Sequence, residues 1–172
     1  TYVTEFPEDL DWGYGLDLGF ENSYTALVKV AIKGNNLYIK EMFFELGLNA
    51  RKICDRFELL GIGKRDEIVA DRQNKDTISM LRDEYGYNII ECTKGQNSVA
   101  DQSNILKDMV IHIEENSKNV YRQISSYQYI VLRGLVTNQP VKANDDAVDA
   151  MRYIAIHKLT KINYGVYTPK VV

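Results

Sequence analysis

Cysteine and histidine, the residues that build most zinc sites, are scarce in this 172-residue chain, with two of each. Cys54 and Cys92 lie far apart and form no CxxC pattern, and His112 and His157 stand alone, so no zinc site is expected. Free thiols of this kind are typical of a protein in a reducing cytoplasm.

Long apolar runs are also missing. No run approaches about 18 residues, so no transmembrane helix is expected and a membrane is not a predicted partner. The first residues, TYVTEFPEDLDW, carry acids where a signal peptide would have a basic end and an apolar stretch. The motif GxxxxGK followed by Ser or Thr is absent, so we do not expect this chain to hydrolyse ATP by itself.

The overall charge of the chain is −3, whereas nucleic-acid binders are often basic. This charge argues only slightly against a DNA partner, because a nuclease that binds metal through carboxylates concentrates negative charge that the ions reverse locally. The length and the 45% hydrophobic content suit one globular domain with a real core. We expect a lead-in at 1–12, the domain at 13–160 and a tail at 161–172.

The order of the expected elements indicates a mixed sheet with helices on both faces. Three antiparallel strands are expected first, with a hairpin turn at Gly34, and the helix after them is expected to begin at Asn49. The strands are expected at 12–20, 24–33, 37–44, 67–71 and 87–92, the helices at 50–60, 75–85, 99–109 and 145–160, a strand or hairpin within 110–135, and a loop at 134–143.

Asp17 is the first unusual residue, because it lies inside an expected strand, WGYGLDLGF. Gly15 and Gly19 share its face, and the leucines lie on the other. Glycine in a strand often marks the close approach of a ligand or another backbone, and a charge in such a place needs a partner or a metal ion. The alternative is that Asp17 lies in a turn.

Asp71 ends the expected short strand EIVAD. In open sheets with helical crossovers, ligands collect at the carboxyl ends of strands. Asp71 is therefore a second candidate ligand. The alternative is that Asp71 caps the following helix, although Asp76 is the better candidate for that cap.

Asp146 and Asp149, in NDDAVDAMRYIAI, are three residues apart and share one face of an expected helix. Acids in a first helical turn are ordinary, because they interact well with the helix dipole. Asp149 lies a turn further in, among alanine, valine and methionine, and is less easily explained in this way. Its alternative is a salt bridge with Arg152.

Together these carboxylates suit a divalent-metal site. Mg²⁺ prefers carboxylate oxygens and keeps several waters. Two such ions about 3.5–4 Å apart stabilise both the attacking and the leaving oxygen at a phosphodiester. That chemistry needs acids converging from separate elements and no His or Cys.

The motifs GLDLG, VAD, KGQNS and the run from ISSYQYIVL to NQPVKANDDAVDAMRYI resemble the nuclease domain of phage terminase large subunits, over roughly residues 14–158. The resemblance implies a ribonuclease H-like mixed sheet, with three antiparallel strands followed by parallel strands and helices on both faces. It also implies a metal-dependent endonuclease that cuts double-stranded DNA concatemers during viral genome packaging.

The resemblance further implies that Asp17 bridges two Mg²⁺ or Mn²⁺ ions, that Asp71 binds one of them and that Asp149 binds the other. Asp146 stands where many relatives have His in an HxxDAxRY motif and is a plausible extra metal ligand. After VAD, residues 72–74 replace a small residue and an acid before proline, so the match there is looser.

Three basic residues are candidate DNA contacts, namely Lys94, Arg72 and Arg152. Lys94, in TKG, is expected near the site and within reach of a DNA phosphate. Its alternative is a solvated loop lysine, and the alternative for Arg152 is a pair with Asp149.

The implied partners are double-stranded DNA and, in a full-length protein, an ATPase domain, the terminase small subunit and the portal. The implied location is the host cytoplasm, in a packaging motor that is not part of the mature virion. Two rivals stay open. One is an actin-like ATPase lobe, since GLDLG followed by a hairpin resembles the phosphate-binding hairpin of that group, and the other is a portal-docking module whose nuclease activity is lost.

Overall fold

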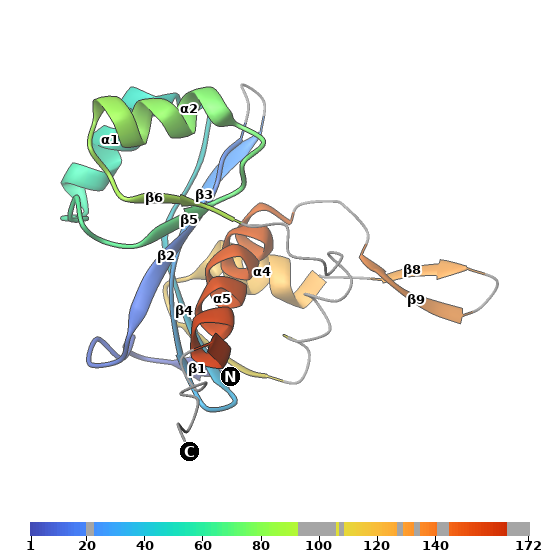
Figure 1. The fold of residues 1–172 in the computed structure, drawn as a ribbon. Coiled ribbons are helices and arrows are strands. Elements are labelled where there is room, and N and C mark those ends of the chain that lie inside the picture. Colours follow the sequence, from blue (N-terminus) through green and yellow to red (C-terminus); the bar gives the residue numbers. More distant parts are fainter. Residues whose placement is uncertain are drawn as a thin grey trace, which may run out of the picture.

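A mixed sheet with strand order β1-β7-β4-β3-β2-β5-β6 forms the centre of the chain (Figure 1). The computed structural model describes residues 1–19, 23–92, 106, 109–126, 129–132, 135–140 and 145–164. The strands are β1 (Tyr2–Val3), β2 (Trp12–Asp17), β3 (Tyr24–Lys33), β4 (Asn36–Leu46), β5 (Ile68–Ala70), β6 (Ile89–Glu91), β7 (Val110–Glu114), β8 (Tyr129–Leu132) and β9 (Leu135–Pro140). The helices are α1 (Ala50–Leu59), α2 (Lys75–Ser79), the π-helix η1 (Met80–Glu84), α4 (Lys118–Ser126) and α5 (Asp146–Tyr164).

The middle of the sheet is antiparallel and its flanks are parallel. β3 pairs antiparallel with both β2 and β4, and Gly34 makes the turn between β3 and β4 with a φ of 59°, which glycine adopts without strain. β5 runs parallel to β2, and β6 to β5. On the other side, β7 runs parallel to β4, and β1 to β7. The predicted order of antiparallel and then parallel strands is confirmed.

Helices cover both faces of this sheet (Figure 1). Val28 and Val30 of β3 are buried in one core with residues of α4 and α5. Leu27, which points the opposite way because strand side chains alternate, is buried in a second core with Leu16 and residues of α1, α2 and η1. No helix in the described part of the chain is both long enough and apolar enough to cross a membrane.

Asn49 begins α1 as predicted, and its side chain accepts a hydrogen bond of 3.0 Å from the backbone N–H of Lys52. The helix predicted at 75–85 is present in two parts, because α2 changes into the π-helix η1 at Met80. The helix predicted at 99–109 lies outside the described residues except for Leu106, which is buried.

The prediction of a strand or hairpin throughout 110–135 is wrong in its middle, where α4 forms. Val120 and Ile124, one helical turn apart, both pack into the core. The carboxylate of Glu41 accepts the backbone N–H groups of Asn119 (2.9 Å) and Val120 (3.1 Å) at the start of the helix. Glu41 lies 78 positions from Asn119, so no local sequence pattern could reveal this cap.

The prediction of a loop at 134–143 is also wrong, because β9 occupies most of that range and pairs antiparallel with β8. The two strands form a hairpin that projects from the rest of the chain (Figure 1). Pro140 is the last residue of β9, a place where proline, which has no N–H to donate, is tolerated.

The N-terminal residues 1–12, expected as a lead-in, contribute to the folded body. β1 adds to the sheet beside β7, and Phe6 is buried. The buried Lys29 forms an ion pair with Glu8, and its Nζ lies 3.8 Å from the centre of the Trp12 ring. A cation over an aromatic face is attracted to it, so this contact holds the segment against β3.

Two glycines of β2 let α5 pack directly on the sheet. A Cβ atom at Gly15 would lie 1.8 Å from the backbone oxygen of Ala150, and one at Gly13 would lie 2.8 Å from Cδ1 of Ile154. Alternate residues of a strand share a face, so Asp17 lies on the same face as both glycines. The glycine pattern in the sequence therefore marks the close approach of another backbone.

We expect Gly15→Ala to lower the free energy of unfolding by about 3 kcal/mol or more, because the added methyl group overlaps backbone that cannot move without displacing α5. Gly13→Ala is the matched control, with an expected loss of about 1 kcal/mol, because it meets the end of a side chain that can turn away. Urea unfolding followed by circular dichroism measures both, and equal losses would contradict this account of the packing.

Candidate metal centre

The first two candidate ligands come from neighbouring strands. Asp17 is the last residue of β2, and Asp71 follows β5 directly. Since β2 and β5 run parallel with Leu16 opposite Ala70, the residues that come next, Asp17 and Asp71, leave the same edge of the sheet. This edge is the carboxyl end of both strands, where ligands collect in sheets of this kind.

α5 brings the other two aspartates to this edge. The hydroxyl of Tyr153 lies 3.4 Å from Oδ1 of Asp17 and 3.4 Å from Oδ2 of Asp149. These two carboxylate oxygens are therefore separated by no more than twice that distance. Two side chains at such a separation can share a pair of ions about 3.5–4 Å apart.

The electrostatics of Asp17 show that the four carboxylates form one group. Burial, and then the charges of Asp149, Asp146 and Asp71, raise the pKa of Asp17 from 3.8 to about 8, against a hydrogen bond from Tyr153 that lowers it. Without a counter-charge, a site like this holds a proton near neutral pH. A divalent cation would displace that proton by supplying the missing positive charge.

Asp146 is the first residue of α5 and is partly buried. Nε2 of Gln123 donates a hydrogen bond of 3.5 Å to its Oδ2. Burial raises the pKa of Asp146 and the charge of Asp145 raises it further, while hydrogen bonds from the backbone and Gln123 oppose the shift. The Asp146 carboxylate thus has a specific donor as well as acidic neighbours.

Asp149 forms the salt bridge that was its alternative interpretation, with Nη1 of Arg152 2.9 Å from its Oδ1. The same carboxylate also lies beside Tyr153 and contributes to the raised pKa of Asp17. The salt bridge therefore coexists with membership of the acidic group. Since Arg152 is only 6% exposed, its charge is held inside the protein next to Asp149.

Sequence reasoning missed two residues of this site. Tyr153 lies four positions after Asp149, and that helical spacing was a signal that could have found it. Gln123 lies on α4, which was not expected to be a helix, so no local signal placed it near Asp146.

The three basic residues predicted to contact DNA have different surroundings. Arg72 is exposed beside Asp71, at the edge of the acidic group. Arg152 is buried against Asp149. Lys94 lies outside the described residues, and DNA contact by all three stays a prediction.

The donor set suits a hard divalent cation. Oδ1 of Asp71 is buried without a hydrogen-bond partner within the described ranges, and a buried carboxylate oxygen in that state is costly unless it meets a cation. Four carboxylates and no soft ligand favour Mg²⁺ or Mn²⁺. Among the residues with described side chains, no three acidic, His or Cys groups yet converge on one point. Like charges repel, and a bound cation would draw these oxygens together.

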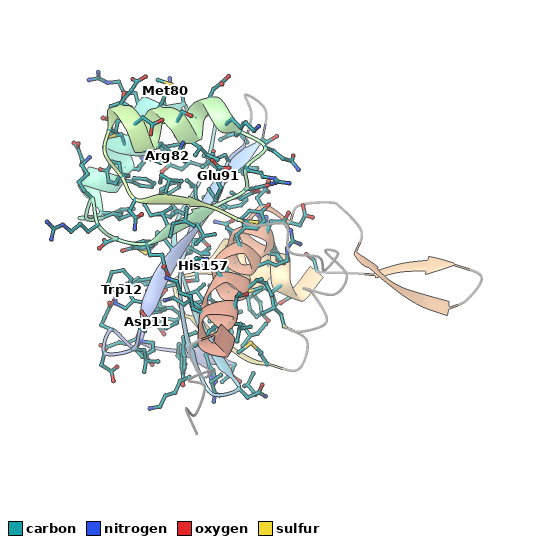
Figure 2. The ribbon with its side chains drawn as sticks, in the orientation of Figure 1. Asp11, Trp12, Met80, Arg82, Glu91 and His157 are labelled. Atoms are coloured by element: carbon teal, nitrogen blue, oxygen red, sulfur yellow. The ribbon has the colours of Figure 1, made fainter. Side chains whose placement is uncertain are left out.

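A separate ionic cluster holds the other half of α5. Nζ of Lys158, only 4% exposed, lies 3.0 Å from Asp11 and 3.6 Å from Glu67, and His157 and Lys161 also contact Glu67. Burial alone would raise the pKa of Glu67, but the hydrogen bond from Lys161 and the three positive neighbours lower it overall. This cluster, where His157 and Asp11 appear in Figure 2, neutralises itself and anchors the helix.

Comparisons with known proteins establish the fold. Comparison with protein families and with curated proteins gives no match. The nuclease domain of the large terminase of bacteriophage SPP1, with bound Mn, is 21% identical with a TM-score of 0.78, over 86% of each chain. The large terminase nuclease of thermophilic phage G20c, with bound magnesium, is 16% identical with a TM-score of 0.59, over 88% of this chain and 84% of that one.

The large terminase of another thermophilic bacteriophage is 22% identical with a TM-score of 0.70, and the match covers 92% of this chain and 42% of the terminase. This chain thus spans less than half of that longer protein. The shared fold confirms the predicted ribonuclease H-like mixed sheet with helices on both faces.

We expect Asp17→Asn to stabilise the metal-free domain. An aspartate that ionises near its ordinary pKa when unfolded, but near pH 8 when folded, makes stability fall as pH rises between these two values. Asparagine removes this loss. A gain of only 1 kcal/mol moves Tm by roughly 2–4 °C in a domain of this size, so we expect a Tm at least about 3 °C higher at pH 8 in EDTA, and a much smaller difference near pH 4.5.

Thermal unfolding of both proteins at several pH values measures this effect. Asp55→Asn, a change at an exposed position on α1, is the control and should leave the pH dependence as it is. If Asp17→Asn lowers Tm at pH 8 in EDTA, the raised pKa is wrong.

Proposed function

We propose that this chain is a divalent-metal-dependent DNA endonuclease, the nuclease domain of a viral terminase large subunit. The observation that carries the proposal is the gathering of Asp71, Asp146 and Asp149 around the buried Asp17 at the carboxyl edge of the sheet. Support comes from the fold, which is shared with terminase nuclease domains holding Mn in one case and magnesium in another.

The four carboxylates would divide the work of holding two ions. Asp17, the most enclosed, would reach both, Asp71 would bind one with its unpartnered oxygen, and Asp149 would bind the other. When bound, such ions activate a water and stabilise the leaving 3′ oxygen of a phosphodiester. Asp146 would add a further oxygen, in the position where the HxxDAxRY motif of many relatives has its histidine.

Three side chains would prepare these ligands. Arg152 and Tyr153 contact opposite oxygens of Asp149 and so fix the plane of its carboxylate. The exposed Arg72, beside Asp71, is placed to meet a phosphate of the substrate. Groups that orient metal ligands are often as important for affinity as some of the ligands themselves.

The proposed substrate is double-stranded DNA, in the form of genome concatemers that are cut when viral packaging starts and ends. The longer terminase relative has more than twice the length of this chain. In the corresponding whole protein, this domain would act beside an ATPase domain, the small subunit and the portal, in the cytoplasm of the host. Low sequence specificity is expected, because nothing in the sequence resembles a groove-reading module.

We expect Asp17→Asn and Asp149→Asn each to reduce cleavage of a supercoiled plasmid in Mn²⁺ by at least about 100-fold, because each removes a ligand charge from the metal pair. Asp55→Asn, which removes an equal charge from the surface of α1, should keep wild-type activity. Circular dichroism shows whether each variant is folded. Full activity in both site variants would refute the assignment.

We also expect Mn²⁺ to raise the Tm of the wild-type domain. Binding to the folded state alone gives about 2.7 kcal/mol at a concentration 100 times the Kd, which corresponds to a rise of roughly 5–10 °C. Asp17→Asn should lose most of this rise, and EDTA should reverse it in the wild type. A wild-type Tm that does not respond to millimolar Mn²⁺ would favour a docking module without a working metal site.

A further inference from the structure

Gln123 is a polar side chain enclosed between two helices. It lies on α4, its exposed fraction is 2%, and it faces the beginning of α5. A side-chain amide in such a place must find hydrogen-bond partners, because burying it without them is costly. The partners that it has indicate its role.

The two ends of the Gln123 amide meet two different needs of α5. Oε1 accepts the backbone N–H of Ala147 at 2.7 Å, and this N–H belongs to the first turn, where helical amides lack partners within the helix. Nε2 donates to Oδ2 of Asp146 at 3.5 Å. One residue therefore holds both the backbone and the first acidic side chain of α5.

α4 is itself fixed to the sheet, which makes Gln123 a firm support. The Glu41 carboxylate of β4 accepts the backbone N–H groups of Asn119 and Val120 and the side-chain amide of Asn119 at 2.7 Å. In return, the hydroxyl of Ser117, just before α4, accepts the backbone N–H of Glu41 at 2.8 Å. A continuous series of hydrogen bonds thus runs from β4 through α4 to the start of α5.

We propose that Gln123 is a positioning residue of the metal centre, which orients the Asp146 carboxylate and sets the place of the first turn of α5. This inference rests on the proposed function, because it assumes that the aspartates of α5 bind divalent cations. Its amide donor matches a carboxylate at position 146. Gln123 acts through Asp146 and Ala147, without contact with a metal ion or DNA.

Gln123→Met tests the proposal, since methionine has a similar length and volume but forms neither hydrogen bond. We expect the Kd for Mn²⁺, measured by isothermal titration calorimetry, to rise about tenfold, as for other groups that orient metal ligands. In an Asp146→Ala background the same change should raise Kd by no more than about threefold, because its main target is then missing.

Val120→Ala is the matched control. Val120 is fully buried on the same helix, and its truncation weakens the packing of α4 while leaving both Gln123 hydrogen bonds. We expect Val120→Ala to lower Tm at least as much as Gln123→Met but to leave the Kd for Mn²⁺ within twofold of the wild type. A Kd equally raised in both variants would reduce Gln123 to a packing residue and overturn the proposal.

A second measurement uses the wild-type chain and does not depend on how a variant folds. In nuclear magnetic resonance spectra, the side-chain amide of Gln123 should shift during titration with Mg²⁺, while that of the distant Asn88 should not. An unmoved Gln123 amide, or a Gln123→Met Kd within twofold of the wild type, contradicts the positioning role. Absence of Mn²⁺ binding by the wild type contradicts the proposed function itself.

Discussion

The close approach of α5 to β2 is the constraint on which the rest of the site depends. The backbone oxygen of Ala150 occupies the space that a Cβ atom at Gly15 would need. Asp149 directly precedes Ala150 on the helix, and Asp17 lies two positions after Gly15 on the strand. The contact between these two backbones therefore sets the separation of the two carboxylates, and the acidic group follows from the packing of α5 on β2.

Gathering four aspartates in one place is electrostatically unfavourable, and the chain compensates for it elsewhere. Asp17 is buried among like charges and holds its proton to about pH 8. The favourable charges lie around this group, in the pairing of Arg152 with Asp149 and in the cluster of Lys158 with Glu67 at the far part of α5. Such a distribution is typical of sites whose geometry serves a ligand more than the stability of the empty protein.

Local sequence patterns predicted the parts of this fold that local physics determines. The alternation around Asp17, the turn at Gly34 and the cap at Asn49 each depend on residues within a few positions. The helical face of α5 could be read in the same way. α4 and Gln123 could not, because the helix begins at a carboxylate supplied by Glu41, 78 positions away from Asn119. Contacts of that kind exist only after the sheet has formed.

The order in which these residues occur along the chain has a consequence for biosynthesis. Tyr153 reaches Asp17 across 136 positions, and α5 is the last helix of the described chain. On a ribosome, the strands that carry Asp17 and Asp71 emerge long before the helix that completes the acidic group. A nascent or truncated polypeptide without docked α5 has only half of the ligands, so the proposed attack on DNA is confined to molecules that have finished folding.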